Sequence, residues 1–420
     1  MSDELADVFR REAGRCTATL IRVLGDVDLA EEAVAEAFAI AAARWPETGV
    51  PPNPGAWITT TARNRAIDRL RRESTRTDRY LAAHRLEEGD MPSDDPTGRE
   101  LDALVEVVPD DQLRLMFLCC HPALAPEAQV ALTLRLLGGL ETPEIARAFL
   151  VPEATMAQRI VRAKRKLRDN HAPYRIPSAG ELPERLRAVL AAIALIFTEG
   201  HRATSGDEAV RTDLSEEAIR LARVLVELMP DEPEAIGLLA LLLLTDARRP
   251  ARFDADGALV RLSDQDRSRW DRAKVAEGHA LVRACLRRGR PGPYQLQAAI
   301  AAVHADAPTA ADTDWGQVVA LYDHLLRLQP SPVVALNRAV ALAERDGPDA
   351  GLVALDELDA AALDRYAPFH ASRAGLLLRA GRAAEAVTAF DRALELTTNP
   401  AERRFLSAER ATAAAAAHGT

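Results

Sequence analysis

Six basic side chains and a glutamine lie close together near the middle of the chain, and these residue types could bind nucleic acid. The basic residues fall within ten positions with no acid among them: Arg159, Arg162, Lys164, Arg165, Lys166 and Arg168. Lysine and arginine neutralise phosphates, whereas Gln158 and Arg162 could each make bidentate contacts to bases in the major groove, worth roughly 1–3 kcal/mol per contact. A charge run alone is more often a solvated helix face, so the element that carries these residues decides the interpretation.

That element is predicted to be the second helix of a helix-turn-helix. Thr142 can cap a first short helix with Pro143 in its first turn, and the corner 150–152 precedes a second helix that runs to about Arg168. Four apolar residues recur at helical spacing and are expected to pack inward: Met156, Ile160, Ala163 and Leu167. We expect the other faces to present the DNA-contacting residues: Thr155, Gln158, Arg159, Val161, Arg162 and Arg165.

Composition predicts a globular, all-helical protein of two or three domains. The chain has 420 residues, of which 48% are hydrophobic and 28% charged, and no stretch alternates apolar and polar residues for long enough to predict strands. The net charge of −10 does not exclude nucleic acid, because exposed charges are screened beyond about 8 Å in physiological salt. A second basic patch, residues 62–79, holds seven arginines and three acids.

The cysteines and the N-terminus indicate a protein of the cytoplasm. Four irregularly spaced cysteines do not suit a disulfide framework: Cys16, Cys119, Cys120 and Cys285. Core packing is favoured over a metal site at Cys119-Cys120-His121, because no second pair of ligands follows at a suitable spacing, so we expect no metal and no cofactor. No secretory signal or membrane-spanning segment is predicted, and no membrane contact is expected.

The first 72 residues predict three helices that present acids and arginines. A helix over 4–24 stops at Gly25, and Asp28 with Glu31 resembles a capping box for a helix reaching about Trp45. The alanines of this second helix, with Val34 and Phe38, are expected to supply a narrow apolar stripe that packs in the core. A Pro-rich loop then leads to a third helix that starts at Pro54 and carries the sequence WITTTARNRAIDRLRR. Aromatic and basic residues interleave in this helix, which suits contact with single-stranded or duplex DNA.

These segments together resemble the bacterial RNA polymerase sigma factors of the extracytoplasmic-function (ECF) type. The resemblance implies binding to core RNA polymerase, through its beta and beta-prime subunits, and to promoter DNA. It places polymerase contacts on the second helix, at Asp28, Glu31, Glu32, Glu36 and Phe38. It places minus-ten contacts on the third helix, at Trp57, Arg63, Asn64, Arg65 and Arg69, with Asn64 helping to capture a flipped base. The helix-turn-helix then corresponds to the module that reads the minus-thirty-five element.

The predicted organisation has two sigma modules and a long extension. Its parts are a first module over 1–79, an acidic flexible linker over 80–108, a second module over 109–172, a joint over 173–182, and a helical extension over 183–420. Three segments of the extension share one apolar pattern, at 218–230, 318–330 and 386–398, and the last two lie 68 residues apart. This distance is twice 34, the period of tetratricopeptide repeats, so an α-solenoid-like domain with a protein or peptide ligand is predicted.

Two other classes of protein fit these residues less well, an enzyme and a DNA-binding regulator that works without polymerase. No phosphate loop, dinucleotide motif or nucleophile elbow is present, so an enzyme is not predicted. The densest polar group of the extension is Asp264-Gln265-Asp266-Arg267 with Trp270 and Arg272, and helix capping and ion pairing are favoured there over a pocket. The main rival function is a helix-turn-helix transcriptional regulator with a repeat-based sensor that does not join the polymerase. Such a regulator would not need the first module.

Overall fold

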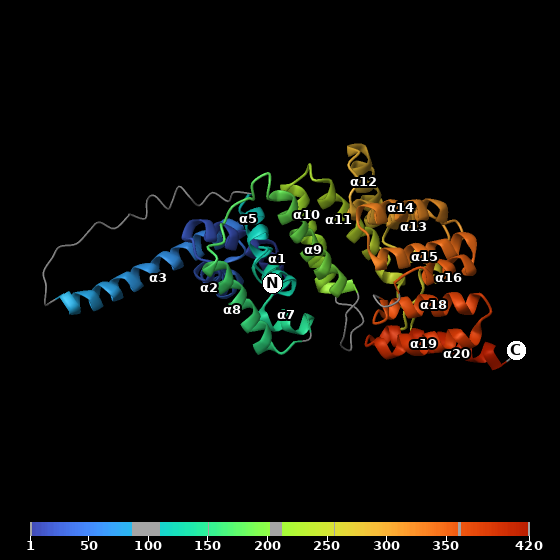
Figure 1. Ribbon diagram of the computed structural model, residues 1–420. Helices are drawn as coiled ribbons and strands as arrows, with labels where there is room; N and C mark the ends of the chain where they lie inside the picture. Colours follow the sequence, from blue (N-terminus) through green and yellow to red (C-terminus); the bar gives the residue numbers. More distant parts are fainter. Residues whose placement is uncertain are drawn as a thin grey trace. The chain divides into compact units, whose positions relative to one another are not determined.

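The computed structural model describes residues 2–85, 110–149, 151–201, 212–255, 257–359 and 363–418. The chain divides into two compact units, Met1–Ala192 and Ile193–Thr420 (Figure 1). Regular structure in these ranges is helical, apart from short 3-10 turns and one isolated antiparallel bridge between Phe253 and Leu259. The prediction of an all-helical fold is therefore confirmed. No described helix is both long and apolar enough to cross a membrane.

The first unit contains two groups of helices and the start of a further helix. The first group is α1 (Ser2–Leu24), α2 (Val27–Thr48) and α3 (Pro54–Arg85). The second group is α5 (Asp110–Cys119), α6 (Pro126–Leu136), α7 (Thr142–Ala148) and α8 (Glu153–Asp169). Helix α9 (Leu182–His201) begins in this unit and ends in the second.

Local backbone chemistry sets the boundaries of α1 and α2. Gly25 adopts a left-handed φ of +69°, which ends α1 as predicted. Asp26 is the N-cap of α2, since its carboxylate accepts a hydrogen bond of 2.8 Å from Leu29 N. The predicted capping box of Asp28 and Glu31 is therefore wrong, and both carboxylates are left available for other partners. Helix α2 continues through Pro46, beyond the predicted end at Trp45.

Helix α3 is longer than the sequence suggested. The side chain of Asn53 accepts a hydrogen bond of 3.0 Å from Ala56 N, and Pro54 occupies the first turn, where its missing N–H costs nothing. The helix runs to Arg85 and so takes up the first six residues of the predicted 80–108 linker. The rest of that linker prediction lies outside the described residues.

The second group contains the predicted pair of helices α7 and α8, joined by a short turn. Glu141 occupies the N-cap position of α7, because the side chain of Glu144 accepts a hydrogen bond of 2.7 Å from Glu141 N. The expected cap, Thr142, is instead the first helical residue. Val151 N donates to Ala146 O at 3.1 Å and closes the corner, and α8 starts directly after Pro152 as predicted.

The cysteines pack inside the protein. All four are buried and free, in agreement with the predicted core role. In the first unit, Thr59 Oγ1 donates to Cys16 Sγ at 3.2 Å and so links α3 to α1. Cys119 and Cys120, at the end of α5, contact α6 through Leu132 O and Thr133 Oγ1, both at 3.8 Å. Burial raises the pKa of the Cys120 thiol to about 12, which keeps it neutral.

The second unit continues as a succession of helices that pack mainly on their neighbours in sequence (Figure 1). They are α10 (Thr212–Leu228), α11 (Pro233–Asp246), α12 (Arg272–Arg288), α13 (Pro293–Asp306), α14 (Trp315–Leu328), α15 (Pro332–Asp346), α16 (Pro348–Asp356), α18 (Ala367–Arg379), α19 (Ala383–Leu396) and α20 (Pro400–His418). Three 3-10 turns interrupt the succession between α11 and α12: η1 (Arg249–Ala251), η2 (Leu262–Asp264) and η3 (Arg267–Arg269).

The segments with a shared apolar pattern form helices α10, α14 and α19. Gly381, with a φ of +77°, turns the chain between α18 and α19. Most helices of the series pack on the next helix, and α11 packs on both α12 and α13. Packing between successive helices is how helical repeats build a continuous core. The assignment to tetratricopeptide repeats stays a prediction.

Candidate nucleic-acid interface

Helix α8 separates its apolar and polar residues as predicted. Met156, Ile160, Ala163 and Leu167 are all buried and fix the helix against the rest of its module. Five of the six residues expected at the minus-thirty-five element are exposed: Thr155, Gln158, Val161, Arg162 and Arg165. Arg159 is half-buried. Val161 leaves 64% of its surface in solvent, which is unusual for a valine and suits contact with a thymine methyl group.

Two of the candidate base-reading residues form a hydrogen bond with each other. Arg162 Nη2 donates to Gln158 Oε1 at 2.9 Å across one helical turn. Both side chains are exposed, so water already competes for this hydrogen bond and its net contribution to stability is small. The pair can therefore separate at little cost when bases offer other partners. Arg165 similarly forms only a 3.4 Å ion pair with Asp169, and both side chains are largely exposed.

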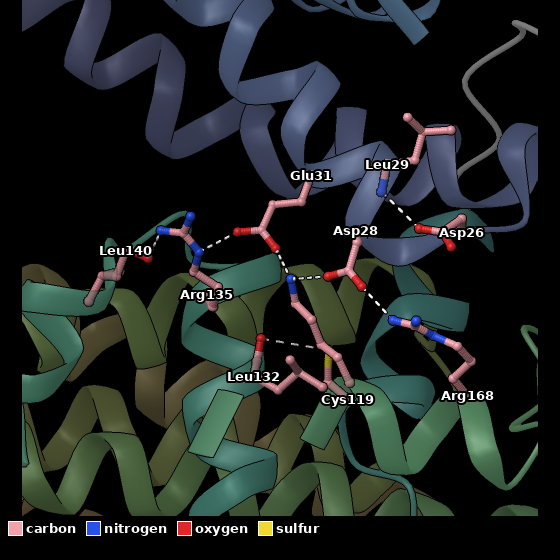
Figure 2. Close-up of polar contacts among 10 residues, drawn as sticks. Asp26, Asp28, Leu29, Glu31, Cys119, Leu132, Arg135, Leu140 and Arg168 are labelled. Atoms are coloured by element: carbon pink, nitrogen blue, oxygen red, sulfur yellow. Dashed lines mark hydrogen bonds and ion pairs between the residues drawn. The ribbon is translucent and has the colours of Figure 1, made fainter. Parts of the chain in front are cut away.

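Two other basic residues of α8 are bound by acids of α2. Lys164 Nζ lies 2.8 Å from Asp28 Oδ1 and also contacts Glu31, and Arg168 Nη2 lies 2.6 Å from Asp28 Oδ2. Figure 2 shows Asp28 facing Arg168 and Glu31 facing Arg135, which lies on α6 and also donates to Leu140 O at 3.2 Å. Asp28 and Glu31, two of the predicted polymerase contacts, thus form ion pairs with basic side chains of the DNA-binding module. We call these contacts the α2–α8 ion-pair network.

Lys164 is the central cation of this network. Its side chain is only 13% exposed, whereas that of Arg168 is 64% exposed. Burial by itself would lower the pKa of Lys164, but Glu31 and Asp28 outweigh burial and the pKa is raised. The ammonium group therefore stays charged at neutral pH and remains paired. Next to it, Asp28, Lys164 and Arg168 help line a cavity of about 310 Å³.

A second polar contact joins the two helical groups near the C-terminal end of α1. Asp111 of α5 is 1% exposed and accepts hydrogen bonds of 2.8 and 3.0 Å from Arg22 Nε. Tyr174 donates its hydroxyl to Ala18 O at 2.7 Å and to Asp111 O at 3.0 Å, and burial raises the pKa of this phenol. Buried ion pairs of this kind are costly to break singly, because the remaining charge is left without a partner.

The backbones also approach closely between the two groups. A Cβ placed on Gly14 of α1 would lie 2.6 Å from Leu137 O, which follows α6. A Cβ on Gly139 would lie 2.9 Å from the ring of Phe9. Two glycines therefore allow α1 and the α6–α7 connection to touch. Together with the ion pairs, this contact holds the two groups in one closed unit.

Two residues of the predicted minus-ten and polymerase sites are buried in the structure. Phe38 is 6% exposed and packs edge-on to Phe9 with ring centroids 4.7 Å apart, which agrees with its predicted place in the apolar stripe of α2, and its polymerase contact stays a prediction. Arg63 is also 6% exposed and does not present its guanidinium to solvent as expected. Arg69 pairs with Glu32, which joins one predicted DNA contact to one predicted polymerase contact.

The remaining predicted residues of this module stay accessible. Asn64 and Arg65 are exposed on α3, and Glu36 is exposed on α2. Trp57 is half-buried and packs edge-on to Trp45, with ring centroids 5.4 Å apart. These four residues agree in exposure with a contact role, which itself stays a prediction.

Comparisons with known proteins assign both groups of helices to one family. Residues 8–76 match the model for Sigma-70 region 2, and residues 114–167 match the model for Sigma-70, region 4. The chain is also 27% identical over 170 residues to a protein of Mycobacterium tuberculosis (strain H37Rv) named "Probable ECF RNA polymerase sigma factor SigI". This chain belongs to the sigma-70 family, as an ECF-type sigma factor with a C-terminal extension.

The relatives of this sigma factor differ in how much of the chain they match. The match to the M. tuberculosis protein covers 40% of this chain and 56% of that protein. A protein of Rhizobium meliloti (strain 1021), "Uncharacterized protein R00370", is 48% identical over 388 residues, which cover 92% of this chain and 90% of the relative. Residues 185–286 match a family model described as "Family of unknown function (DUF6596)". Transcription initiation and DNA binding follow from the two sigma regions.

The residues that join the two sigma regions could not be paired from the sequence. Arg22, Arg135 and Tyr174 were not singled out, and Lys164 and Arg168 were interpreted only as phosphate contacts. Each of the four cations among these residues has an acidic partner that lies 89 to 140 positions away in sequence. Spacing along a helix reveals neighbours three or four residues apart and carries no information about pairs at such separations.

Proposed function

We propose that this sigma factor joins core RNA polymerase through the beta and beta-prime subunits, directs it to specific promoters and assists promoter opening. The observation that carries the proposal is the exposed face of α8, with Gln158 and Arg162 opposite a fully buried apolar stripe. One helix of this size binds DNA too weakly to select promoters alone. Mounting both modules on polymerase makes the second DNA contact intramolecular and raises its effective concentration. The cytoplasm is the compartment where these partners meet.

The direct test is assembly with core polymerase. We expect tagged full-length protein to retain core enzyme in a pull-down and to support run-off transcription from its own promoter. The rival function, a helix-turn-helix regulator that works without joining the polymerase, predicts promoter binding with no retention of core enzyme. Absence of both core binding and sigma-dependent transcripts, with promoter binding intact, would replace the proposal with that rival.

Within the minus-ten module, the exposed residues are the best candidates for opening the promoter. Asn64 and Arg65 lie on the accessible side of α3, and Trp57 offers part of an aromatic face next to them. An amide can hydrogen-bond the edge of an unstacked base, and an aromatic ring can stack on it. We assign capture of the non-template strand to these residues and leave Arg63 in a packing role.

The closed unit also supports a proposal about the free protein. Asp28 and Glu31 cannot bind polymerase while they hold Lys164, Arg168 and Arg135, and the two α8 cations cannot bind phosphates while they hold acids. We therefore propose that docking on polymerase and release of the α2–α8 ion-pair network occur together.

The free energy needed to break the α2–α8 ion-pair network is small enough for docking on polymerase to supply it. Exposed ion pairs contribute about 0.2–1 kcal/mol each, and the partly buried Lys164 contacts contribute more. The network therefore amounts to a few kcal/mol, which new contacts with polymerase and DNA can offset. Such a balance keeps the free protein closed without making opening prohibitive.

Two substitutions on α8 should separate base reading from phosphate binding. Arg162→Ala should relax promoter choice at one or two upstream positions, because it removes a contact worth roughly 1–3 kcal/mol. Lys166→Ala should weaken all promoters alike and reduce the salt dependence of binding, since Lys166 is exposed and adds a point charge. Transcription from a randomised promoter library measures both effects. An equal, sequence-independent loss from the two variants would contradict the assignment of Arg162.

We also propose that the C-terminal extension regulates or supports transcription. Its helices pack in series and present surfaces suited to a protein or peptide ligand. It is joined to the second sigma region by a helix that contacts that region, because Arg185 of α9 donates to Phe117 O of α5. A packed helix transmits position better than a loose linker does, so a ligand of the extension could influence the sigma regions.

A further inference from the structure

The turn after α11 carries three arginines with very different partners. Arg249 pairs with Glu216 at 3.3 Å and with Asp246 at 3.5 Å, and Arg252 donates to His201 O. Arg248 differs from both, because its guanidinium forms no hydrogen bond and no ion pair with any described residue. Its Nε atom is nevertheless buried. A guanidinium stays charged in proteins, so burying part of one without a counter-charge is energetically unfavourable.

The surroundings of Arg248 add positive charge. Asp271 N donates to Ala247 O at 2.9 Å, which places Arg248 beside η3 and the start of α12. From η3, Arg267 lies with its guanidinium carbon 4.9 Å from the ring centre of Trp270 and donates to Ala307 O at 2.7 Å. The charge environment of Arg248 consists of Arg267 and the phenol of Tyr322, and includes no carboxylate among the described residues.

The titration of these groups agrees with an excess of positive charge. Burial, and then repulsion from Arg267, lowers the pKa of Arg248 to about 10. Burial, and then Arg248 and Arg267, lowers the pKa of His304 to about 4. Burial, and then the arginines Arg252, Arg248 and Arg249, lowers the pKa of His201 to about 2. Each histidine is therefore neutral at physiological pH, and the arginines hold the charge.

The acids near this turn already have other partners. Asp312, whose charge acts on Arg267, accepts hydrogen bonds from Thr309 N at 3.1 Å and Thr309 Oγ1 at 2.7 Å. Asp246, whose side chain is fully buried, pairs with Lys274 Nζ at 2.5 Å and with Arg249. Asp266 caps η3 through Ser268 N at 2.9 Å, and Asp271 caps α12 through Ala273 N at 3.0 Å. The capping interpretation of this polar group is thus confirmed for Asp266, but it leaves Arg248 without a carboxylate partner among the described residues. A counter-ion for Arg248 has to come from outside these side chains.

Several buried side-chain nitrogens near Arg248 also lack partners. Trp270 Nε1 and Arg249 Nη1 are buried and form no hydrogen bond within the described residues, and the same holds for His201 Nδ1. A planar guanidinium with further N–H donors is the arrangement that proteins use for phosphate and carboxylate groups. We propose that Arg248, with Arg267, Trp270 and His201 around it, forms a binding site for the oxyanion group of a small molecule. The C-terminal extension would then respond to an anionic metabolite as well as to a macromolecular ligand.

The test uses the full chain in oxyanion-free Tris chloride buffer. Isothermal titration calorimetry and thermal unfolding are followed during additions of sodium phosphate or sodium succinate, with sodium chloride at matched ionic strength as the baseline. We expect at least one oxyanion to bind and to raise the Tm above the chloride baseline. Phosphate and succinate as separate titrations distinguish a phosphate-bearing from a carboxylate-bearing ligand. No effect beyond that of chloride from either ion would overturn the proposal.

Substitutions connect the binding to Arg248. Arg248→Gln should abolish the oxyanion response and, without oxyanion, should be at least as stable as the unsubstituted protein, because an uncompensated charge has been removed. Arg269→Gln is the matched control, since Arg269 lies exposed in the same turn as Arg267, and should keep the response. If Arg248→Gln does not fold, Arg248→Lys should bind at least about tenfold more weakly, because it keeps the charge and loses the planar fork. An unchanged response in the variant that folds would contradict the assigned site.

Discussion

Tying α2 to the end of α8 should reduce transcription by this sigma factor at least about tenfold, because the closed unit could then no longer open. Val27 and Ala172 line the same cavity beside the α2–α8 ion-pair network, and neither is a predicted contact for polymerase or DNA. A protein carrying Val27→Cys and Ala172→Cys can be crosslinked with a reductant-cleavable bismaleimide. The natural cysteines are buried and should react slowly. Run-off transcription with core enzyme measures the loss.

Reductant provides the main control for this experiment. Cleaving the linker should restore activity, and each single-cysteine variant treated with the same reagent should remain active. The crosslinked protein should also bind core polymerase more weakly, because Asp28 and Glu31 stay paired with Lys164, Arg168 and Arg135. Full activity of the crosslinked protein would show that the closed unit is compatible with transcription and would reject the proposed opening.

Removing the C-terminal extension should lower run-off transcription by about tenfold or more at the same promoter and core enzyme concentration. We expect this loss because α9 contacts the second sigma region, where Arg185 donates to Phe117 O. The comparison needs two fragments, one ending at Ser178, before α9, and one ending at Ala192, which retains Arg185. A partial recovery in the longer fragment would assign part of the effect to α9 itself.

The truncation has to be separated from simple misfolding. Circular dichroism should show that each fragment keeps its helical content, and a core polymerase pull-down should show whether docking survives. If both fragments match the full-length protein in transcription and in core affinity, then the extension has a role outside transcription. That result would leave the proposed sigma activity of the first two regions intact.

The sequence predicted local features of the fold with good accuracy. The stop at Gly25, the start of α8 after Pro152 and the burial of its four apolar residues all follow from interactions within a few positions. Glycine with positive φ, proline in a first turn and helical spacing of apolar residues act through the nearby backbone. The error in the cap of α2 is also local. Asp26 and Asp28 lie two residues apart at the start of this helix, and the carboxylate of Asp26 is the one that accepts from the free N–H of Leu29.

The chemistry of the candidate interface was also visible in residue types. Gln158, Arg162 and Arg165 were placed on the exposed face of α8 from spacing alone, and the structure leaves them there. Phe38 lies in the core, as its place in the apolar stripe of the second helix predicted, whereas the burial of Arg63 was not foreseen. A resemblance transfers a position along a helix and does not show which side chain the neighbouring helices cover. Burial depends on those neighbours, so it is settled only when α1, α2 and α3 pack together.

By itself, the sequence determined the helices, their order and the family of the first 170 residues, because each depends on local spacing and on short motifs. Tertiary structure alone decided which charges find partners. It brought Asp28 to Lys164 across 136 positions and Arg22 to Asp111 across 89. It left Arg248 without an acid among the residues that the structure describes, although the chain carries a net charge of −10. Coulomb interactions depend on distance in space and on local dielectric, and neither quantity can be read from separation along the chain.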